Sequence, residues 1–166
     1  MNNTTFNDGL GEWRKIGMLT INDNLSLSDS SYFYDEPLIV KLKPDQYKLE
    51  INTLNIDGYE HVKTVRILPN DIQFCIGQVL GHVNVDFGQI AICDRAIVEN
   101  IFENLGDAGM PSYYDQLSIE DLSAPISLNN SIFMYVVKPG FGDGNYSVSA
   151  LLSPQNELLG VEINCI

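Results

Sequence analysis

Residues 47–51 read YKLEI, and this short stretch shows the pattern on which the fold depends. Tyr47, Leu49 and Ile51 share one face of an extended chain, while a lysine and a glutamate share the other. An apolar face opposite a polar face is typical of a β-strand that packs on a core with one side and meets water with the other. The sequence therefore predicts a strand here that borders a hydrophobic core.

Strand signals recur along the rest of the chain. Apolar or alternating runs that stop at proline, glycine, asparagine or aspartate predict further strands at residues 17–23, 38–42, 62–68, 72–79, 83–93, 132–137, 146–152 and 158–163. We expect residues 38–42 to form a hairpin with residues 47–51, and the glycine-rich residues 138–145 to be a hairpin turn. Residues 24–31 are polar, and they are predicted to be a loop.

One short helix is expected in the middle of the chain. Residues 96–105 carry isoleucine and leucine at helical spacing. Asp94 is expected to cap this helix and Gly106 to end it. Residues 106–125 are predicted to be a long loop, with a short turn of helix at residues 118–121.

These elements together predict a mainly β fold: a two-sheet, mostly antiparallel sandwich with one short helix. The chain has 166 residues, of which 45% are hydrophobic and 19% charged, and this suits one globular domain. We predict an N-terminal arm at residues 1–16 and a single β-sandwich domain at residues 17–166. A local echo links the two halves, because Lys43-Pro44 precedes Tyr47 much as Lys138-Pro139 precedes Tyr146.

Negative charge is the strongest compositional signal. The chain holds 22 acidic and 9 basic residues, a net charge of −13, and no basic residue lies between Arg95 and Lys138. Such a surface repels nucleic acid and anionic membrane, so neither is expected as a partner. It favours a basic protein, because opposite fields speed encounter. Plain solubility is the other explanation for an acidic composition, and it stays open.

Cysteine usage and the absence of catalytic motifs narrow the class further. Cys75, Cys93 and Cys165 form an odd, widely spaced set, which predicts neither a disulfide framework nor a zinc site. Cys75 and Cys93 lie in apolar stretches and are predicted to be buried. Free thiols and the lack of a signal peptide predict a cytoplasmic protein. No catalytic residue, metal or cofactor is predicted.

The acidic stretch around the predicted long loop is the most informative for binding. Aromatic side chains amid carboxylates are typical of a surface that contacts a protein. The predicted partner-binding residues are Glu99, Glu103, Asp107, Tyr113, Tyr114, Asp115, Glu120 and Asp121. A lid whose tyrosines merely cover one end of the core is the alternative.

Four aspartates suggest a different kind of site. Asp23, Asp86, Asp94 and Asp143 lie at the ends or kinks of predicted strands. If the sheets bring several of them together, they could hold a metal ion or act as acid and base. Turn-forming and capping aspartates are the ordinary outcome. Both interpretations stay open.

The order of motifs resembles an uncharacterised bacterial domain family. That family has a G-x-[Leu/Ile/Val]-x-x-x-Asp strand, a Pro-x-x-Tyr hairpin, a Val-Asp-x-Gly strand and a terminal Gly-Asp-Gly-x-Tyr hairpin. The matching stretches are GMLTIND (17–23), PDQY (44–47), VDFG (85–88) and GDGNY (142–146). Proline is usual where this chain has Asn24 and Ser147. The family has no settled activity, so the resemblance bears mainly on the fold.

Small acidic bacterial proteins of this sort resemble immunity proteins, which bind and block a toxin domain. The leading hypothesis is therefore an intracellular immunity protein whose acidic, tyrosine-containing face occludes a cognate, basic, nuclease-like toxin. A first alternative is a small-molecule or metal-binding sandwich or a hydrolase that uses the four strand-end aspartates. A second is a structural module with no toxin partner. The oligomeric state stays open.

Overall fold

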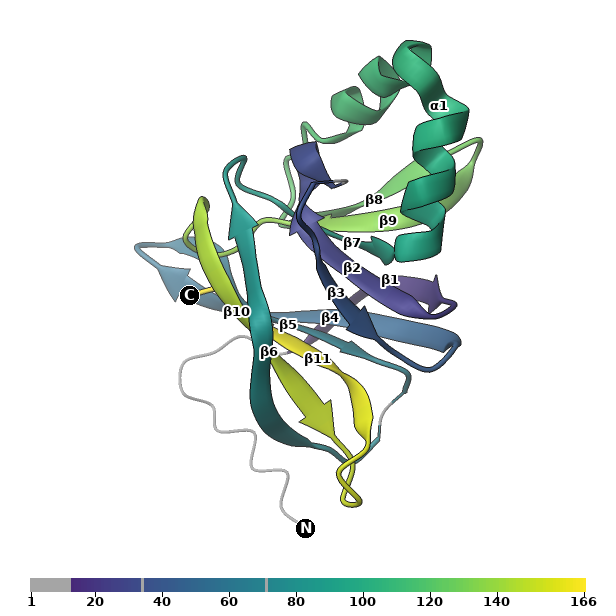
Figure 1. Cartoon of the computed structure of the whole chain (residues 1–166). Coiled ribbons are helices and arrows are strands. Elements are labelled where there is room, and N and C mark those ends of the chain that lie inside the picture. The colour runs from purple at the N-terminus through teal and green to yellow at the C-terminus, as the bar shows by residue number, and fades with distance from the viewer. Residues whose placement is uncertain (1–12, 34, 71) are drawn as a thin grey trace.

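The structure is a computed structural model and describes residues 13–33, 35–70 and 72–166 (Figure 1). In this part of the chain, eleven strands form two sheets. Sheet A has the order β1-β4-β5-β11-β10-β6, with β1 (Arg14–Ile21), β4 (Asp45–Ile56), β5 (Tyr59–Leu68), β11 (Leu158–Asn164), β10 (Gly144–Leu152) and β6 (Cys75–Val85). Sheet B has the order β3-β2-β7-β9-β8, with β3 (Leu38–Lys41), β2 (Asn24–Asp29), β7 (Ile90–Asp94), β9 (Ser131–Val137) and β8 (Ser123–Leu128).

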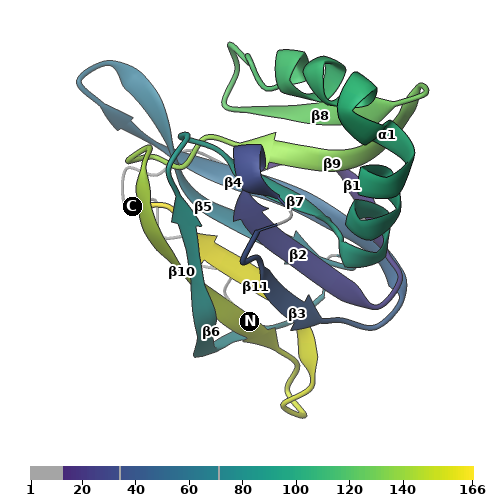
Figure 2. The same cartoon turned by 45° about the horizontal axis from the view of Figure 1, so that its top comes forward.

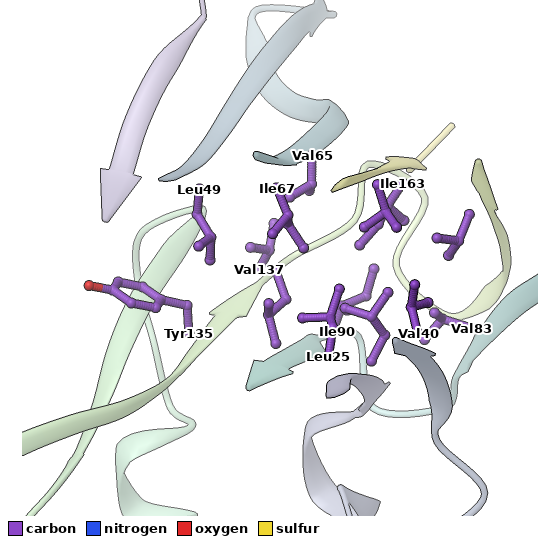
Figure 3. Packing of buried hydrophobic residues seen from close by; sticks show 14 of the residues in the cluster. Leu25, Val40, Leu49, Val65, Ile67, Val83, Ile90, Tyr135, Val137 and Ile163 are labelled. Atoms are coloured by element: carbon purple, nitrogen blue, oxygen red, sulfur yellow. The ribbon is translucent and has the colours of Figure 1, made fainter. Parts of the chain in front are cut away.

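The two sheets enclose the main core, and the helix α1 (Arg95–Gln116) covers the other face of sheet B (Figure 2). Leu25 and Ile90 of sheet B meet Leu49, Ile67 and Ile163 of sheet A between the sheets (Figure 3). Neighbouring strands within both sheets run antiparallel throughout the described residues. The prediction of a mainly β, two-sheet antiparallel sandwich with a helix is confirmed.

Strand β2 contradicts the prediction of a polar loop at residues 24–31, which rests on the four serines in this stretch. The residues of β2 alternate like those of any strand. Leu25 and Leu27 point into the main core, while Ser26 and Ser28 lie beside Cys93 and Ala91 in the layer beneath α1. Ser26 and Ser28 are buried, so a polar residue type does not mark an exposed position here.

Both predicted hairpins are wrong, namely the one between residues 38–42 and 47–51 and the one whose turn is residues 138–145. Strand β3 belongs to sheet B and β4 to sheet A, and the connection from β9 to β10 crosses between the sheets in the same way. Alternation predicts a strand that faces a core, but both sheets face the same core, so it cannot say which sheet a strand joins.

The echo between the two halves nevertheless has a structural counterpart. The Tyr47 hydroxyl donates to the Lys43 carbonyl at 2.7 Å, and the Tyr146 hydroxyl donates to the Gly142 carbonyl at 2.7 Å. Each tyrosine thus ties the start of its strand to a carbonyl four residues upstream, directly after the chain has changed sheets. Burial raises the pKa of both phenols, with further contributions from neighbouring acidic groups.

Helix α1 differs from its prediction in length. Gly106 leaves the helical conformation, with φ 53° and ψ −171°, as a predicted helix end should. A second helical segment follows it, so the predicted loop at residues 106–125 is wrong. Met110, Tyr113 and Leu117 continue the apolar face and pack against sheet B, which holds this second segment in place. The predicted helical turn at residues 118–121 is absent, and strand β8 begins at Ser123.

The three cysteines are free thiols. Cys93 and Cys165 are buried, as predicted for Cys93, but Cys75 is exposed at the start of the edge strand β6. Burial and the neighbouring Asp94 raise the pKa of Cys93 from 9.0 to about 12, and burial raises that of Cys165 to about 12. None of the helices in the described residues is long and apolar enough to cross a membrane.

These buried thiols predict a loss of stability at alkaline pH. Above pH 9 the thiols ionise in the unfolded chain but stay protonated in the folded one up to about pH 12, so the free energy of unfolding falls as pH rises. The slope should reach about 1 kcal/mol per thiol per pH unit. Urea midpoints measured from pH 8 upward should show this fall, and Cys93→Ala or Cys165→Ala should flatten it. Cys75→Ala, which removes an exposed thiol, is the matched control, and an equal flattening there would contradict the assignment.

Candidate functional site

The predicted acidic residues lie on α1 and the segment after it, above sheet B (Figure 1). Their side chains are exposed where the structure describes them, namely at Glu99, Glu103, Asp115, Glu120 and Asp121. The side chain of Asp107 lies outside the described residues. Among the described side chains of this set there is a single ion pair, between Arg95 Nε and Glu99 Oε1 at 3.4 Å. The carboxylates thus form one solvent-facing set on α1 and residues 117–122, which we call the acidic face.

Positive charge is concentrated on the other layer of the sandwich. Five of the nine basic residues lie on strands of sheet A, namely Arg14, Lys15, Lys48, Lys63 and Arg66. Some of these are neutralised there, since Arg66 pairs with Glu162 at 2.7 Å and Lys48 with Glu50 at 3.3 Å. The layer that carries α1 is therefore the more negative side of the molecule.

Tyr113 does not belong to the surface predicted to bind a partner. Its exposed fraction is 2%, and its hydroxyl donates to the Ser30 carbonyl beneath α1. Its ring packs against Phe33, with centroids 4.8 Å apart, and burial raises the pKa of its phenol well above the ordinary value. Tyr113 anchors the helix, which was the alternative interpretation of this tyrosine, and only its neighbour Tyr114 is exposed, at 42%.

Side chains of glutamine and lysine fasten the end of α1 and the segment after it. Gln116 places its amide against the edge strand β8, where it accepts from the Ser127 N–H and donates to the Ser127 carbonyl, both at 2.9 Å. Gln89 donates to the Leu117 carbonyl at 2.7 Å, and Lys138 donates to the Ile119 carbonyl at 2.6 Å. The acidic face is thereby held in one conformation by bonds to three different parts of the sheet layer.

The four strand-end aspartates separate into two pairs. Asp94 lies at the Leu25 end of β2 and accepts a hydrogen bond from the Asn22 side chain at 2.8 Å. Asp23 directly follows Asn22 and so lies near the same end of β2. Asp86 and Asp143 lie at the other end of β2, since the Asp86 N–H bonds to Asp29. Val85 of β6 pairs with Gly144 of β10. Asp86 directly follows Val85 and Asp143 directly precedes Gly144, so the two aspartates occupy opposite positions just beyond this antiparallel pair.

One aspartate of this set is fully buried. Asp94 occupies the position before α1, as predicted, but its carboxylate bonds to Asn22 instead of capping the helix, and its Oδ1 atom has no partner. Among the described residues no group of three or more histidine, cysteine, aspartate or glutamate side chains is placed to hold a metal ion. The structure therefore separates the four aspartates, with two near each end of β2.

Sequence reasoning missed an exposed aromatic pair beside Asp86. Tyr32 is 41% exposed and Phe87 is 56% exposed, and their rings meet edge to face with centroids 5.3 Å apart. Both rings stand on segments that the buried Asp29 holds. Its Oδ1 accepts from the Ser31 N–H at 2.8 Å, and its Oδ2 accepts from the N–H groups of Asp86 and Phe87 at 2.6 and 2.9 Å. Nothing in the sequence relates position 29 to position 87.

Gln89 connects this aromatic pair to the acidic face. Gln89 lies two residues after Phe87 in the sequence, and its side chain donates a hydrogen bond to the Leu117 carbonyl at the end of α1. The 3₁₀ helix that carries Tyr32 is joined to the same glutamine, since the Ser30 N–H donates to the Gln89 carbonyl at 3.2 Å. Exposed aromatic area and exposed carboxylates therefore meet at one end of the α1 layer.

A shallow hollow lies on the opposite layer, over the outer face of sheet A. Its volume is about 340 Å³, and side chains from β6, β10, β11 and the connection before β10 line it. Asp143 and Phe141 are among its lining residues. The sequence interpretation attached function to neither Phe141 nor the strand residues of this hollow.

Comparison with known proteins gives no relative from which a function can be transferred. No family model matches the chain, and neither a curated protein nor a solved structure matches it.

Proposed function

We propose that this protein is an immunity protein, which binds a basic, nuclease-like toxin domain and blocks its active-site cleft with the acidic face. The observation that carries the proposal is the set of exposed carboxylates on α1 and residues 117–122, with Arg95 as the one basic residue in this part of the sequence. A cleft that binds nucleic acid is lined with lysine and arginine. Carboxylates presented on a fixed helix can occupy such a cleft in place of phosphates.

Charge alone steers encounter but supplies little affinity, so an interface also needs buried aromatic or apolar anchors. Tyr114, Tyr32 and Phe87 offer such anchors, since each is more than 40% exposed. Their loss of water-exposed area on binding would add favourable energy that the carboxylates do not provide. Tyr114 belongs to the predicted set, and Tyr32 and Phe87 take the role that the sequence interpretation assigned to Tyr113.

Preorganisation supports a binding role over a purely structural one. The hydrogen bonds of Gln116, Gln89 and Lys138 fix the acidic face, and those of Asp29 fix the aromatic pair. Because these segments are already ordered, binding would cost little conformational entropy. A rigid surface with exposed rings and exposed carboxylates suits recognition of a folded partner.

The test uses the protein encoded by the gene next to that of this chain as the candidate toxin. Co-expression of this chain should protect cells from that protein, and the two should form a complex in titration calorimetry. Asp115→Lys with Glu120→Lys should weaken the complex by about 100-fold and remove protection, because like charges then face each other. Asp45→Lys with Glu157→Lys, which changes the net charge equally on exposed residues of the sheet A layer, is the matched control.

Two results would overturn the proposal at different levels. Absence of both protection and a complex would refute the immunity function. Protection that survives the reversal at Asp115 and Glu120 but fails with the control variant would show that the partner binds elsewhere on the surface. Rising salt should also weaken the wild-type complex, because exposed charges are screened.

A further inference from the structure

The hollow over sheet A has a floor made of one row of polar side chains. His82 on β6 pairs directly with Ser147 on β10. Asn164 on β11 lies beside Ser147, because it follows Ile163, whose partner is Val148. The three residues stand on the face opposite Tyr146, Val148 and the main core. Within the described residues, no hydrogen bond of these three side chains to the rest of the protein is found.

The wall of the hollow is an aromatic ring on a fixed turn. Phe141 is 63% exposed, although it is a large apolar side chain. The turn beneath it is held by the Gly142 N–H, which donates to the Pro139 carbonyl at 3.0 Å, and by the Tyr146 hydroxyl, which donates to the Gly142 carbonyl. Gly140 packs so closely on the Val62 carbonyl that a Cβ atom would lie 2.5 Å from its oxygen. The ring is thus displayed by a turn that cannot easily fold it away.

The lining excludes most classes of small ligand. No lysine or arginine lines the hollow and Asp143 does, so an anion such as phosphate would be repelled. A divalent cation is not expected, because Asp143 is the one carboxylate side chain of the lining and no group of three metal-ligating side chains occurs among the described residues. A wholly apolar ligand would leave the amide, hydroxyl and imidazole groups without partners. The remaining class is a neutral ligand with several hydroxyl groups and one apolar face.

We infer that this hollow binds a sugar ring. The C–H face of the ring stacks on Phe141, and two neighbouring hydroxyls donate to the Asp143 carboxylate. His82, Ser147 and Asn164 supply further donors and acceptors to the ring hydroxyls. The volume of about 340 Å³ lies at the small end of the range of about 300–1,000 Å³ for ligand sites, which fits a single ring. This site lies on sheet A and does not depend on the acidic face.

The experiment is an NMR titration of the ¹⁵N-labelled full chain with D-glucose, D-galactose and N-acetyl-D-glucosamine, each added separately, and with adenosine as a planar comparison. At least one sugar should shift the amide signals of residues 82, 141–147 and 164 in a saturable way, with a dissociation constant in about the millimolar range. Phe141→Ala should weaken binding by about tenfold or more. Tyr59→Ala removes an exposed ring that does not line the hollow, and it should leave the sugar affinity unchanged.

The outcomes separate clearly. No saturable shift with any of the three sugars, a shift with adenosine alone, or equal binding by Phe141→Ala would each overturn the inference. Asn164→Ala gives a second test that does not involve the turn, and it should also weaken sugar binding. Thermal unfolding of each variant checks that a lost signal does not come from a lost fold.

Discussion

Replacing Asp29 by alanine is expected to lower the free energy of unfolding by about 3–5 kcal/mol. The carboxylate is 6% exposed and accepts three backbone N–H groups, from Ser31, Asp86 and Phe87. A buried donor that loses its acceptor costs about 1–3 kcal/mol, and hydrogen bonds to a charged acceptor are the stronger kind. Asp86 and Phe87 lie on an exposed turn, so water can compensate in part, and the expected total is less than three full penalties.

The matched control is Asp86→Ala, which stands on the same turn but has an exposed side chain. It should change stability by less than about 0.5 kcal/mol. Asp29→Asn keeps the size of the side chain but turns one acceptor into a donor, so it should fall between the two. Urea unfolding measures all three, and hydrogen exchange of the Asp86 and Phe87 amides reports the loss locally. Equal midpoints for Asp29→Ala and Asp86→Ala would contradict the role of this carboxylate.

Asp29 also connects stability with the proposed interface. It fixes both segments that present the aromatic pair, and these segments are separated by 58 residues between Asp29 and Phe87. In the Asp29→Asn variant, the Tyr32 and Phe87 rings should remain on the surface, but their positions relative to each other should no longer be fixed. If the pair is an anchor, partner binding should then weaken more than the fall in stability explains, because ordering the loops would oppose association.

The strands of this fold could be predicted because the chain alternates where one face is buried. Tyr47, Leu49 and Ile51 were recognised in this way, and so were most strands of both sheets. The sequence could not reveal how strands are distributed between sheets. The step from β3 to β4 looked like a hairpin because both strands face one shared core, and only contacts distant in sequence decide to which sheet each belongs.

The candidate site divides in the same way into local and long-range features. The carboxylates of the acidic face are exposed, as their charge alone indicates, wherever the structure describes them. Tyr113 and Tyr114 are adjacent and of one type, yet one is buried and the other exposed. Helical geometry separates them, since neighbouring residues in a helix point about 100° apart. The prediction of a loop at residues 106–125 contains no such geometry, so it could not distinguish the two tyrosines. The Asp29 contacts and the polar row in the hollow depend on pairings between distant strands.

Replacing Gly160 by alanine is expected to be among the most damaging single changes in sheet A. A Cβ atom at this position would lie 2.0 Å from the Ile67 carbonyl oxygen and 3.0 Å from its carbon. Both atoms belong to the backbone of the neighbouring strand β5, so no side chain can rotate to relieve the overlap. Relief requires β11 to move away from β5, which would pull Val161 and Ile163 out of the core that they share with Ile67.

Overpacking usually costs about 1–3 kcal/mol, and this variant should reach or exceed the upper end because backbone must move. Gly77→Ala is the matched control, since its Cβ atom would meet side chains and no backbone, with Leu152 Cδ1 at 2.6 Å, Leu152 Cγ at 3.0 Å and Ala150 Cβ at 3.5 Å. Leu152 is half-buried and can turn aside, so the control should cost about 1 kcal/mol or less. Urea unfolding of both variants, with hydrogen exchange of the Val161 amide, makes the comparison. If the two variants unfold at the same urea concentration, β11 does not approach β5 as closely as the structure has it.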